Sequence, residues 1–134
     1  MQFRGKYAFL SNFYEVPITV EGRRFRCVEA AFQAAKCPSR AKEFENLNGS
    51  EAKRLGRKVA LRPDWEEEKL DIMYQLLVAK FAQHPELAEK LKATLEPIIE
   101  DNTWGDTYWG RCNGKGQNHL GQLLEHLKLT LNIL

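Results

Sequence analysis

The chain has 134 residues, a formal net charge of +2, 43% hydrophobic residues and 28% charged residues. This length and balance predict one globular domain over residues 1–134 and exclude a disordered chain. No apolar run is long enough to span a membrane, and the N-terminus lacks the features of a signal peptide. We therefore expect a cytoplasmic protein with no membrane partner. So small a net charge argues against a dedicated DNA binder.

The first 26 residues are expected to form short extended segments. The first, Tyr7–Leu10, leads to a polar break, and Val16–Val20 is rich in β-branched residues around Pro17. The pair Glu21-Gly22 predicts a turn, with Arg23–Arg26 returning as the partner of an antiparallel hairpin. Pro17 restricts the first strand to a sheet edge, because proline has no N–H to donate.

A helical pattern begins after Cys27. One apolar stripe is predicted to be buried: Val28, Ala31, Phe32 and Ala35. A polar stripe of Glu29, Gln33 and Lys36 lies beside it, and the helix dipole favours the ionised form of Glu29 in the first turn. Pro38 ends this helix, and Ser39–Leu47 predicts a further short one.

Later helices follow from start signals. Asn48 and Glu51 have the spacing of a capping box, and a basic run on that helix is either a solvated face or partly a phosphate site: Lys53, Arg54, Arg57 and Lys58. Asp64 predicts the N-cap of the longest helix, with Trp65 at its first position as an indole that clamps the helix end. The core-facing residues of this helix are expected to be Ile72, Met73, Leu76, Leu77 and Phe81.

Three shorter elements complete the prediction. His84-Pro85 ends the longest helix and starts another. Pro97–Glu100 predicts a short strand, and Asn118–Leu131 predicts the final helix.

The densest pattern of functional residue types is Asn102–Gly121. Trp104-Gly105 and Trp109-Gly110 bracket Asp106, and a glycine-rich loop with Lys115 follows. Glycine lets the backbone turn sharply or approach a ligand, and tryptophan beside a carboxylate offers a flat surface next to a group that can move a proton. The alternative is an ordered surface loop pinned by buried indoles.

Metal chemistry is not indicated. The three cysteines, Cys27, Cys37 and Cys112, lack C-x-x-C spacing, so we expect reduced thiols and no structural zinc. His119 and His126 have no acidic or cysteine partner at ligand spacing. Nucleotide-binding and common hydrolase motifs are absent, so we expect no cofactor. Two carboxylates with flat apolar surfaces instead suit cleavage of a glycosidic bond.

Ordered blocks along the whole chain resemble the NADAR family. They are Phe9-Leu10-Ser11-Asn12-Phe13, Val28-Glu29-Ala30-Ala31-Phe32-Gln33-Ala34-Ala35-Lys36, Leu55-Gly56-Arg57, Leu61-Arg62-Pro63-Asp64-Trp65, Lys80-Phe81, Asp106-Thr107-Tyr108-Trp109-Gly110 and Gly114-Lys115-Gly116-Gln117-Asn118-His119-Leu120-Gly121. The resemblance implies an N-glycosidase with an α+β, mainly helical fold, short N-terminal antiparallel strands and a C-terminal helix. The resemblance also implies that Trp65 lines the substrate pocket and does not merely clamp the end of the helix.

The family pattern carries over residue by residue. It implies the catalytic positions Glu29, Trp65, Asp106 and Trp109. It also favours substrate contacts by Ser11, Asn12, Phe13, Gln33, Lys36, Arg57, Lys115 and Asn118. The chain has Val28-Glu29-Ala30 where the family often has Ser-Glu-His, so a polar neighbour of the acid is missing. Either carboxyl can be the acid, because the order depends on which one is drier.

Three functions remain open. The family resemblance implies removal of ribose 5-phosphate from ribosylamino-pyrimidine intermediates of riboflavin synthesis, or removal of ADP-ribose from guanine in nucleic acid. The third is a non-catalytic reader of ADP-ribose or nucleotides. Two carboxylates favour the enzyme over the reader, and the dispersed basic surface favours the small substrate.

Overall fold

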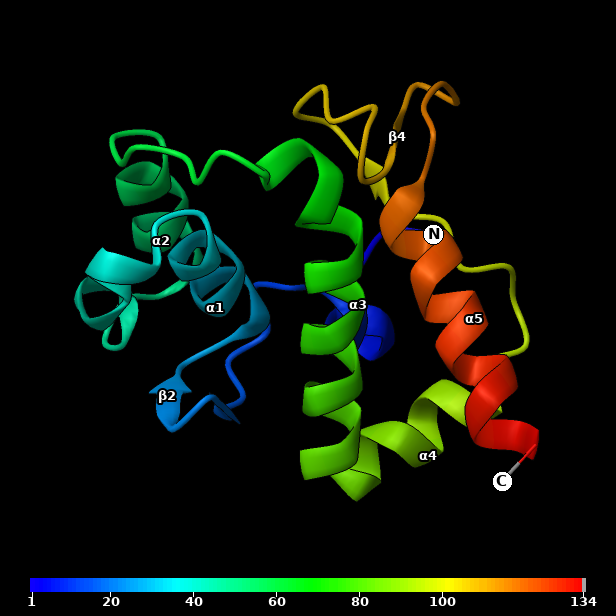
Figure 1. Ribbon diagram of the computed structural model, residues 1–134. Coiled ribbons are helices and arrows are strands. Elements are labelled where there is room, and N and C mark those ends of the chain that lie inside the picture. The colour runs from blue at the N-terminus through cyan, green and yellow to red at the C-terminus, as the bar shows by residue number, and fades with distance from the viewer. Residues whose placement is uncertain (134) are drawn as a thin grey trace. The chain divides into compact units, whose positions relative to one another are not determined.

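The chain folds as two units in the computed structural model, which describes residues 1–133. Unit 1 comprises Met1–Ser11 and His84–Leu134, and unit 2 comprises Asn12–Gln83. Helices dominate both units and the strands are short, which confirms the predicted mainly helical α+β class (Figure 1). Among the described helices, none is both long and apolar enough to cross a membrane.

Unit 2 starts with a β-hairpin. Strands β1 (Ile18–Val20) and β2 (Arg23–Phe25) pair antiparallel, as predicted. The turn Glu21-Gly22 has φ values of 50° and 77°, the left-handed conformation that two-residue hairpin turns need. The side-chain amide of Gln83 accepts from Thr19 N at 2.9 Å and donates to Thr19 O at 2.8 Å. This pairing satisfies the backbone at the open edge of β1, where another strand would otherwise bind.

The helices of unit 2 follow the hairpin (Figure 1). They are α1 (Val28–Ala35), the 3₁₀ helix η2 (Pro38–Phe44), α2 (Gly49–Gly56) and α3 (Trp65–Gln83). The prediction of a helix over Ser39–Leu47 was misplaced, because Pro38 occupies the first turn and the helix ends at Phe44. The capping box of α2 is confirmed: Asn48 Oδ1 accepts from Glu51 N, and Glu51 Oε1 accepts from Asn48 N, both at 2.9 Å.

Helix α1 is buried along nearly its whole length. Its buried residues are Val28, Glu29, Ala30, Ala31, Phe32, Gln33 and Ala34. Four alanines keep the helix thin, so α2, α3 and η2 can all contact it. The polar stripe predicted beside the apolar one is therefore buried as well at Glu29 and Gln33.

Unit 1 contains the 3₁₀ helix η1 (Gly5–Leu10), α4 (Pro85–Ala93) and α5 (His119–Ile133), with α4 packed on α5 (Figure 1). Strands β3 (Asp101–Asn102) and β4 (Arg111–Cys112) form a short parallel pair. The buried side chains of this unit include Phe9, Leu10, Leu87, Leu91, Ile98, Leu120, Leu124 and Leu127.

Two predictions in unit 1 were wrong. The segment Tyr7–Leu10 is not extended, because Gly5 turns the chain at φ 57° into η1. Pro97–Glu100 is not a strand, because side chains bind its backbone: Ile98 N donates to Glu125 at 2.8 Å, and Glu100 N donates to Asn118 at 2.9 Å.

Lys80 of α3 is the largest departure from the predicted core. Its side chain is fully buried, with Nζ 5.6 Å from the ring centroid of Tyr14 and 5.3 Å from that of Phe81. Burial lowers the pKa of Lys80 from 10.5 to about 7, and the electrostatic interaction with Cys27 opposes this shift.

Lys80 should make the stability of the protein depend on pH. Between about pH 7 and 10.5 the unfolded chain holds a proton on this amine that the folded chain releases, so folding becomes more favourable as pH rises. We expect the advantage of Lys80→Met over the parent to shrink across this window, by up to about 1.4 kcal/mol per pH unit. Denaturant unfolding of both proteins at several pH values measures the difference. The control is Lys42→Met, at an exposed lysine, and parallel curves for parent and Lys80→Met would contradict the prediction.

Candidate active site

The predicted site residues fall into two groups, one in each unit. Unit 2 holds Asn12, Phe13, Glu29, Gln33, Lys36, Arg57 and Trp65. Unit 1 holds Ser11, Asp106, Trp109, Lys115 and Asn118.

In unit 2, Glu29 is a buried carboxylate, 9% exposed, in the first turn of α1. One turn later, Gln33 Nε2 donates a 2.6 Å hydrogen bond to Glu29 Oε2. The backbone N–H of Glu29 donates to Asn12 O at 2.9 Å, which ties the start of α1 to the preceding loop. These contacts hold the carboxylate in one orientation in a partly dry environment.

Lys36 continues the same face of α1 and is half-buried. Burial lowers its pKa, Glu29 opposes the shift, and three cations lower the pKa further: Arg57, Lys53 and Lys69. Each of these cations disfavours the charged form of Lys36, and a bound anion would favour it, although Lys69 Nζ also pairs with Glu66 Oε2 at 2.7 Å. Unit 2 therefore offers a cationic cluster, defined as Lys36, Lys53, Arg57 and Lys69, on the side of α1 that carries Glu29.

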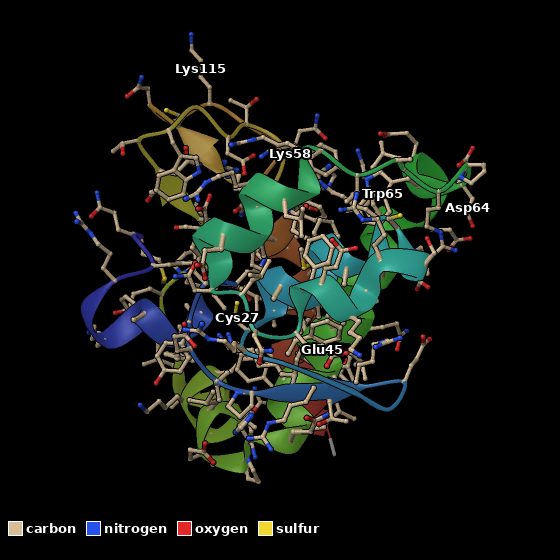
Figure 2. The ribbon with its side chains drawn as sticks, turned by 90° about the vertical axis from the view of Figure 1, so that its left-hand side faces the viewer. Cys27, Glu45, Lys58, Asp64, Trp65 and Lys115 are labelled. Atoms are coloured by element: carbon tan, nitrogen blue, oxygen red, sulfur yellow. The ribbon has the colours of Figure 1, made fainter. Side chains whose placement is uncertain are left out.

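Trp65 lies at the first position of α3 and is 5% exposed, beside Asp64 (Figure 2). Its ring centroid is 5.0 Å from that of Phe32, and Lys36 Nζ is 5.9 Å from its centroid. The indole thus joins the core of α1 to the cationic cluster. Asp64, predicted as the N-cap of α3, directs its carboxylate to Arg62, with Oδ1 2.6 Å from Nε.

The remaining residues of this group lie before α1 and on α2. Asn12 is buried and its Nδ2 donates to the sulfur of Met73 at 3.6 Å. Phe13 is 40% exposed and covers Gly49, where an added Cβ would come within 2.5 Å of the ring. An exposed aromatic ring with one side against the protein can receive a flat ligand on the other.

In unit 1, Asp106 is locked into its loop. Its Oδ1 accepts from Tyr108 N at 3.0 Å and from Trp109 N at 2.9 Å. Asn102 binds the backbone of Asp106 twice, accepting from its N–H at 3.0 Å and donating to its C=O at 2.8 Å. Because only Oδ1 is used by these backbone donors, Oδ2 is left for other partners.

Trp109 and its neighbours form an aromatic group in unit 1. The rings of Tyr108 and Trp109 meet edge to face at 4.9 Å, and Tyr108 lies 4.5 Å from the ring of His119. Trp109 is half-buried, whereas Trp104 is 64% exposed. The alternative of an ordered loop pinned by buried indoles therefore does not hold for Trp104, although the sequence places Trp104 and Trp109 in equivalent Trp-Gly pairs.

The last three residues differ in role. The side chain of Lys115 is exposed and extends away from the loop (Figure 2). Asn118 is buried at φ 53° and uses its amide for the backbone, donating to Ile98 O at 3.0 Å and accepting from Glu100 N. Ser11 is half-buried at the end of η1, where its N–H donates to Ala8 O.

Sequence reasoning missed two kinds of residue. Asn102 holds Asp106, and Lys69 completes the cationic cluster. The signal for Asn102 is its place before a turn, since asparagine binds nearby backbone. Lys69 has no local signal, because it nears Lys36 only through the packing of α3 on α1. Across residues 1–133, no group of three or more His, Cys, Asp or Glu side chains is arranged to hold a metal ion.

Comparisons with known proteins identify the family of this chain. A model of the NADAR domain matches residues 2–132. N-glycosidase YbiA of Escherichia coli (strain K12) is 39% identical over 133 residues, 95% of this chain and 83% of that protein. A riboflavin biosynthesis protein of Vibrio vulnificus (strain YJ016) is 32% identical over 124 residues, 88% of this chain and 34% of that protein. The NMR structure of E. coli YbiA matches with a TM-score of 0.86 and 36% identity, over 99% of this chain and 84% of that one.

Substitutions of Asp106 should separate its structural contacts from its charge. Asp106→Asn keeps an oxygen for the N–H groups of Tyr108 and Trp109, whereas Asp106→Ala leaves both without this acceptor. We expect Asp106→Ala to lower the free energy of unfolding by about 1–3 kcal/mol and Asp106→Asn to lower it by less than about 1 kcal/mol. Thermal and denaturant unfolding give both values. Equal losses in the two variants would show that the charge, not the hydrogen bonds, stabilises the loop.

Proposed function

Because the chain belongs to the NADAR domain family, we propose that it is an N-glycosidase that hydrolyses the C1′–N bond of a phosphorylated ribosyl-base. The observation that carries the proposal is the buried Glu29 carboxylate, held by Gln33 beside the cationic cluster of unit 2. The names of two relatives, an N-glycosidase and a riboflavin biosynthesis protein, support the reaction type and the small substrate.

The proposed reaction needs a negative group near the sugar. As the C1′–N bond breaks, its electron pair goes to the base nitrogen and positive charge develops on the ribose as an oxocarbenium ion. A carboxylate stabilises that charge or takes a proton from the water whose oxygen bonds to C1′. The base nitrogen gains a proton, so one water is consumed and a free sugar and a free base are released. We propose that Glu29 and Asp106 are both required for this step.

The cationic cluster supports a phosphorylated substrate. The pKa of Lys36 is lowered by burial and by Arg57, Lys53 and Lys69, although Glu29 opposes the shift, so a further negative charge would stabilise the protonated amine. A sugar phosphate supplies that charge and accepts several charge-assisted hydrogen bonds. Within unit 2, Trp65 beside Lys36 and the exposed Phe13 offer flat surfaces for the base.

We also propose that residues 1–134 form one family domain, because the NADAR model spans residues 2–132 and so includes both units. Three free thiols, Cys27, Cys37 and Cys112, support a reducing compartment such as the cytoplasm. The reaction is proposed to need no metal.

One experiment tests the function directly. The protein is incubated in excess chelator with a ribosylamino-pyrimidine phosphate and, separately, with a guanine-ADP-ribosylated oligonucleotide, and the products are separated by chromatography. We expect free base and ribose 5-phosphate from the first substrate. If only the oligonucleotide is cleaved and ADP-ribose is released, the substrate is ADP-ribosylated nucleic acid. Tight binding without products would make the protein a reader, and activity restored only by one added metal would refute metal independence.

The carboxylates should matter for turnover rather than for binding. Glu29→Gln and Asp106→Asn nearly preserve shape while they remove negative charge, so each should cut kcat by about 100-fold or more. Substrate affinity should survive, because the lost interaction forms mainly in the transition state. Trp65→Phe should instead weaken binding of the base. Steady-state kinetics of the three variants, with their melting temperatures, check this, and active acid variants would refute the mechanism.

The phosphate contact should appear in the Michaelis constant. We expect Arg57→Ala to raise KM about tenfold or more at low salt with kcat little changed, and Lys115→Ala to show the same if its exposed amine reaches the substrate. The matched control is Arg54→Ala, because Arg54 is likewise exposed, three residues earlier on α2, but is absent from the cationic cluster. An unchanged KM in the Arg57 variant would place the phosphate elsewhere.

A further inference from the structure

Within the described part of the chain, the Gln33 amide is held by a hydrogen bond at its Nε2 end only. Its Nε2 donates to Glu29 Oε2 at 2.6 Å, while within residues 1–133 its Oε1 has no hydrogen-bond partner. Gln33 is 4% exposed, so neither end of the amide is open to solvent. Turning the amide over would place two oxygens at the distance of that hydrogen bond, which is unfavourable unless Glu29 is protonated.

Gly56 makes room for this arrangement. A Cβ at position 56 would lie 1.9 Å from Gln33 Oε1 and 2.7 Å from Gln33 Cδ. The backbone of Gly56 is not in the left-handed region, so the glycine is not needed for its conformation. Its missing side chain leaves the space that the amide of Gln33 fills, as α2 packs on α1.

Other positive charges near Glu29 also favour its ionised form. The N-terminus of α1 and the Lys36 ammonium both favour a negative charge at Glu29. Lys53 of α2, Arg57 at the C-cap of α2 and Lys69 of α3 each lower the pKa of Lys36. The opposing influence is burial of the carboxyl group. The nearby thiol of Cys27 carries no competing charge, because its pKa is raised chiefly by burial and also by Glu29.

We infer that Gln33, given room by Gly56, is a positioning residue that keeps Glu29 ionised. The inference rests on the proposed function. If Glu29 is ionised, its role in that reaction is to stabilise the oxocarbenium ion or to activate water. The proton for the departing base then comes from another group. Sequence alone leaves this order open, because it depends on contacts that only the packed structure contains.

The ionisation of Glu29 can be measured without turnover. Carboxyl carbons of glutamate are labelled with ¹³C, and the Glu29 signal is identified by its loss in Glu29→Gln. We expect the titration midpoint of Glu29 in Gln33→Met to lie about one pH unit or more above that of the parent, because the donor is lost at nearly constant volume. Gln75→Met is the control, at an exposed glutamine of α3. An unchanged or lowered midpoint would overturn the inference.

A second variant tests the role of the glycine. Gly56→Ala should raise the midpoint in the same direction, and it should add little in the Gln33→Met background, because both changes act through one hydrogen bond. Fully additive shifts would overturn the part assigned to Gly56, and if Gly56→Ala does not fold, the Gln33→Met titration decides alone. A parent that cleaves no ribosyl-base refutes the proposed function whatever the titration shows. An active parent whose Glu29 midpoint ignores Gln33 refutes only the inference.

Discussion

The buried carboxylate of Glu29 is the constraint around which unit 2 is arranged. Removing an ionised carboxylate from water costs several kcal/mol unless donors and cations replace the water. Here the amide of Gln33, the start of α1 and the Lys36 ammonium take that place. The small side chains of α1 and the glycine at position 56 follow from the same requirement, because they let two helices approach the polar stripe closely.

In unit 1, the surroundings of the Asp106 carboxylate differ from those of Glu29. Asp106 stays half-exposed. Its loop is fixed by two hydrogen bonds between Asn102 and the Asp106 backbone, and by the N–H groups of Tyr108 and Trp109, which donate to the Asp106 carboxylate. A loop held in this way can present one carboxylate oxygen while the backbone uses the other. The two acids of the proposed reaction thus have different surroundings, one dry and one partly wet, which is how paired carboxylates acquire different roles.

Several features could be read from local sequence because their causes are local. The hairpin turn at Glu21-Gly22, the capping box of Asn48 and Glu51, and the break at His84-Pro85 each depend on a few neighbouring residues. The polar stripe on α1 was also visible, since helical spacing alone puts Glu29 and Gln33 on one face. The 3₁₀ helices were misread, because short segments rich in mixed signals have no clear period.

What the sequence by itself determined is the set of helices, the hairpin, the family and the candidate carboxylates. Only tertiary structure decided how those carboxylates are held. Helix packing buried the polar stripe, brought Lys69 near Lys36 and enclosed Lys80, which no local pattern predicts for a lysine. The reason is physical: periodicity and capping act over a few residues, whereas desolvation and charge depend on neighbours that lie far apart along the chain.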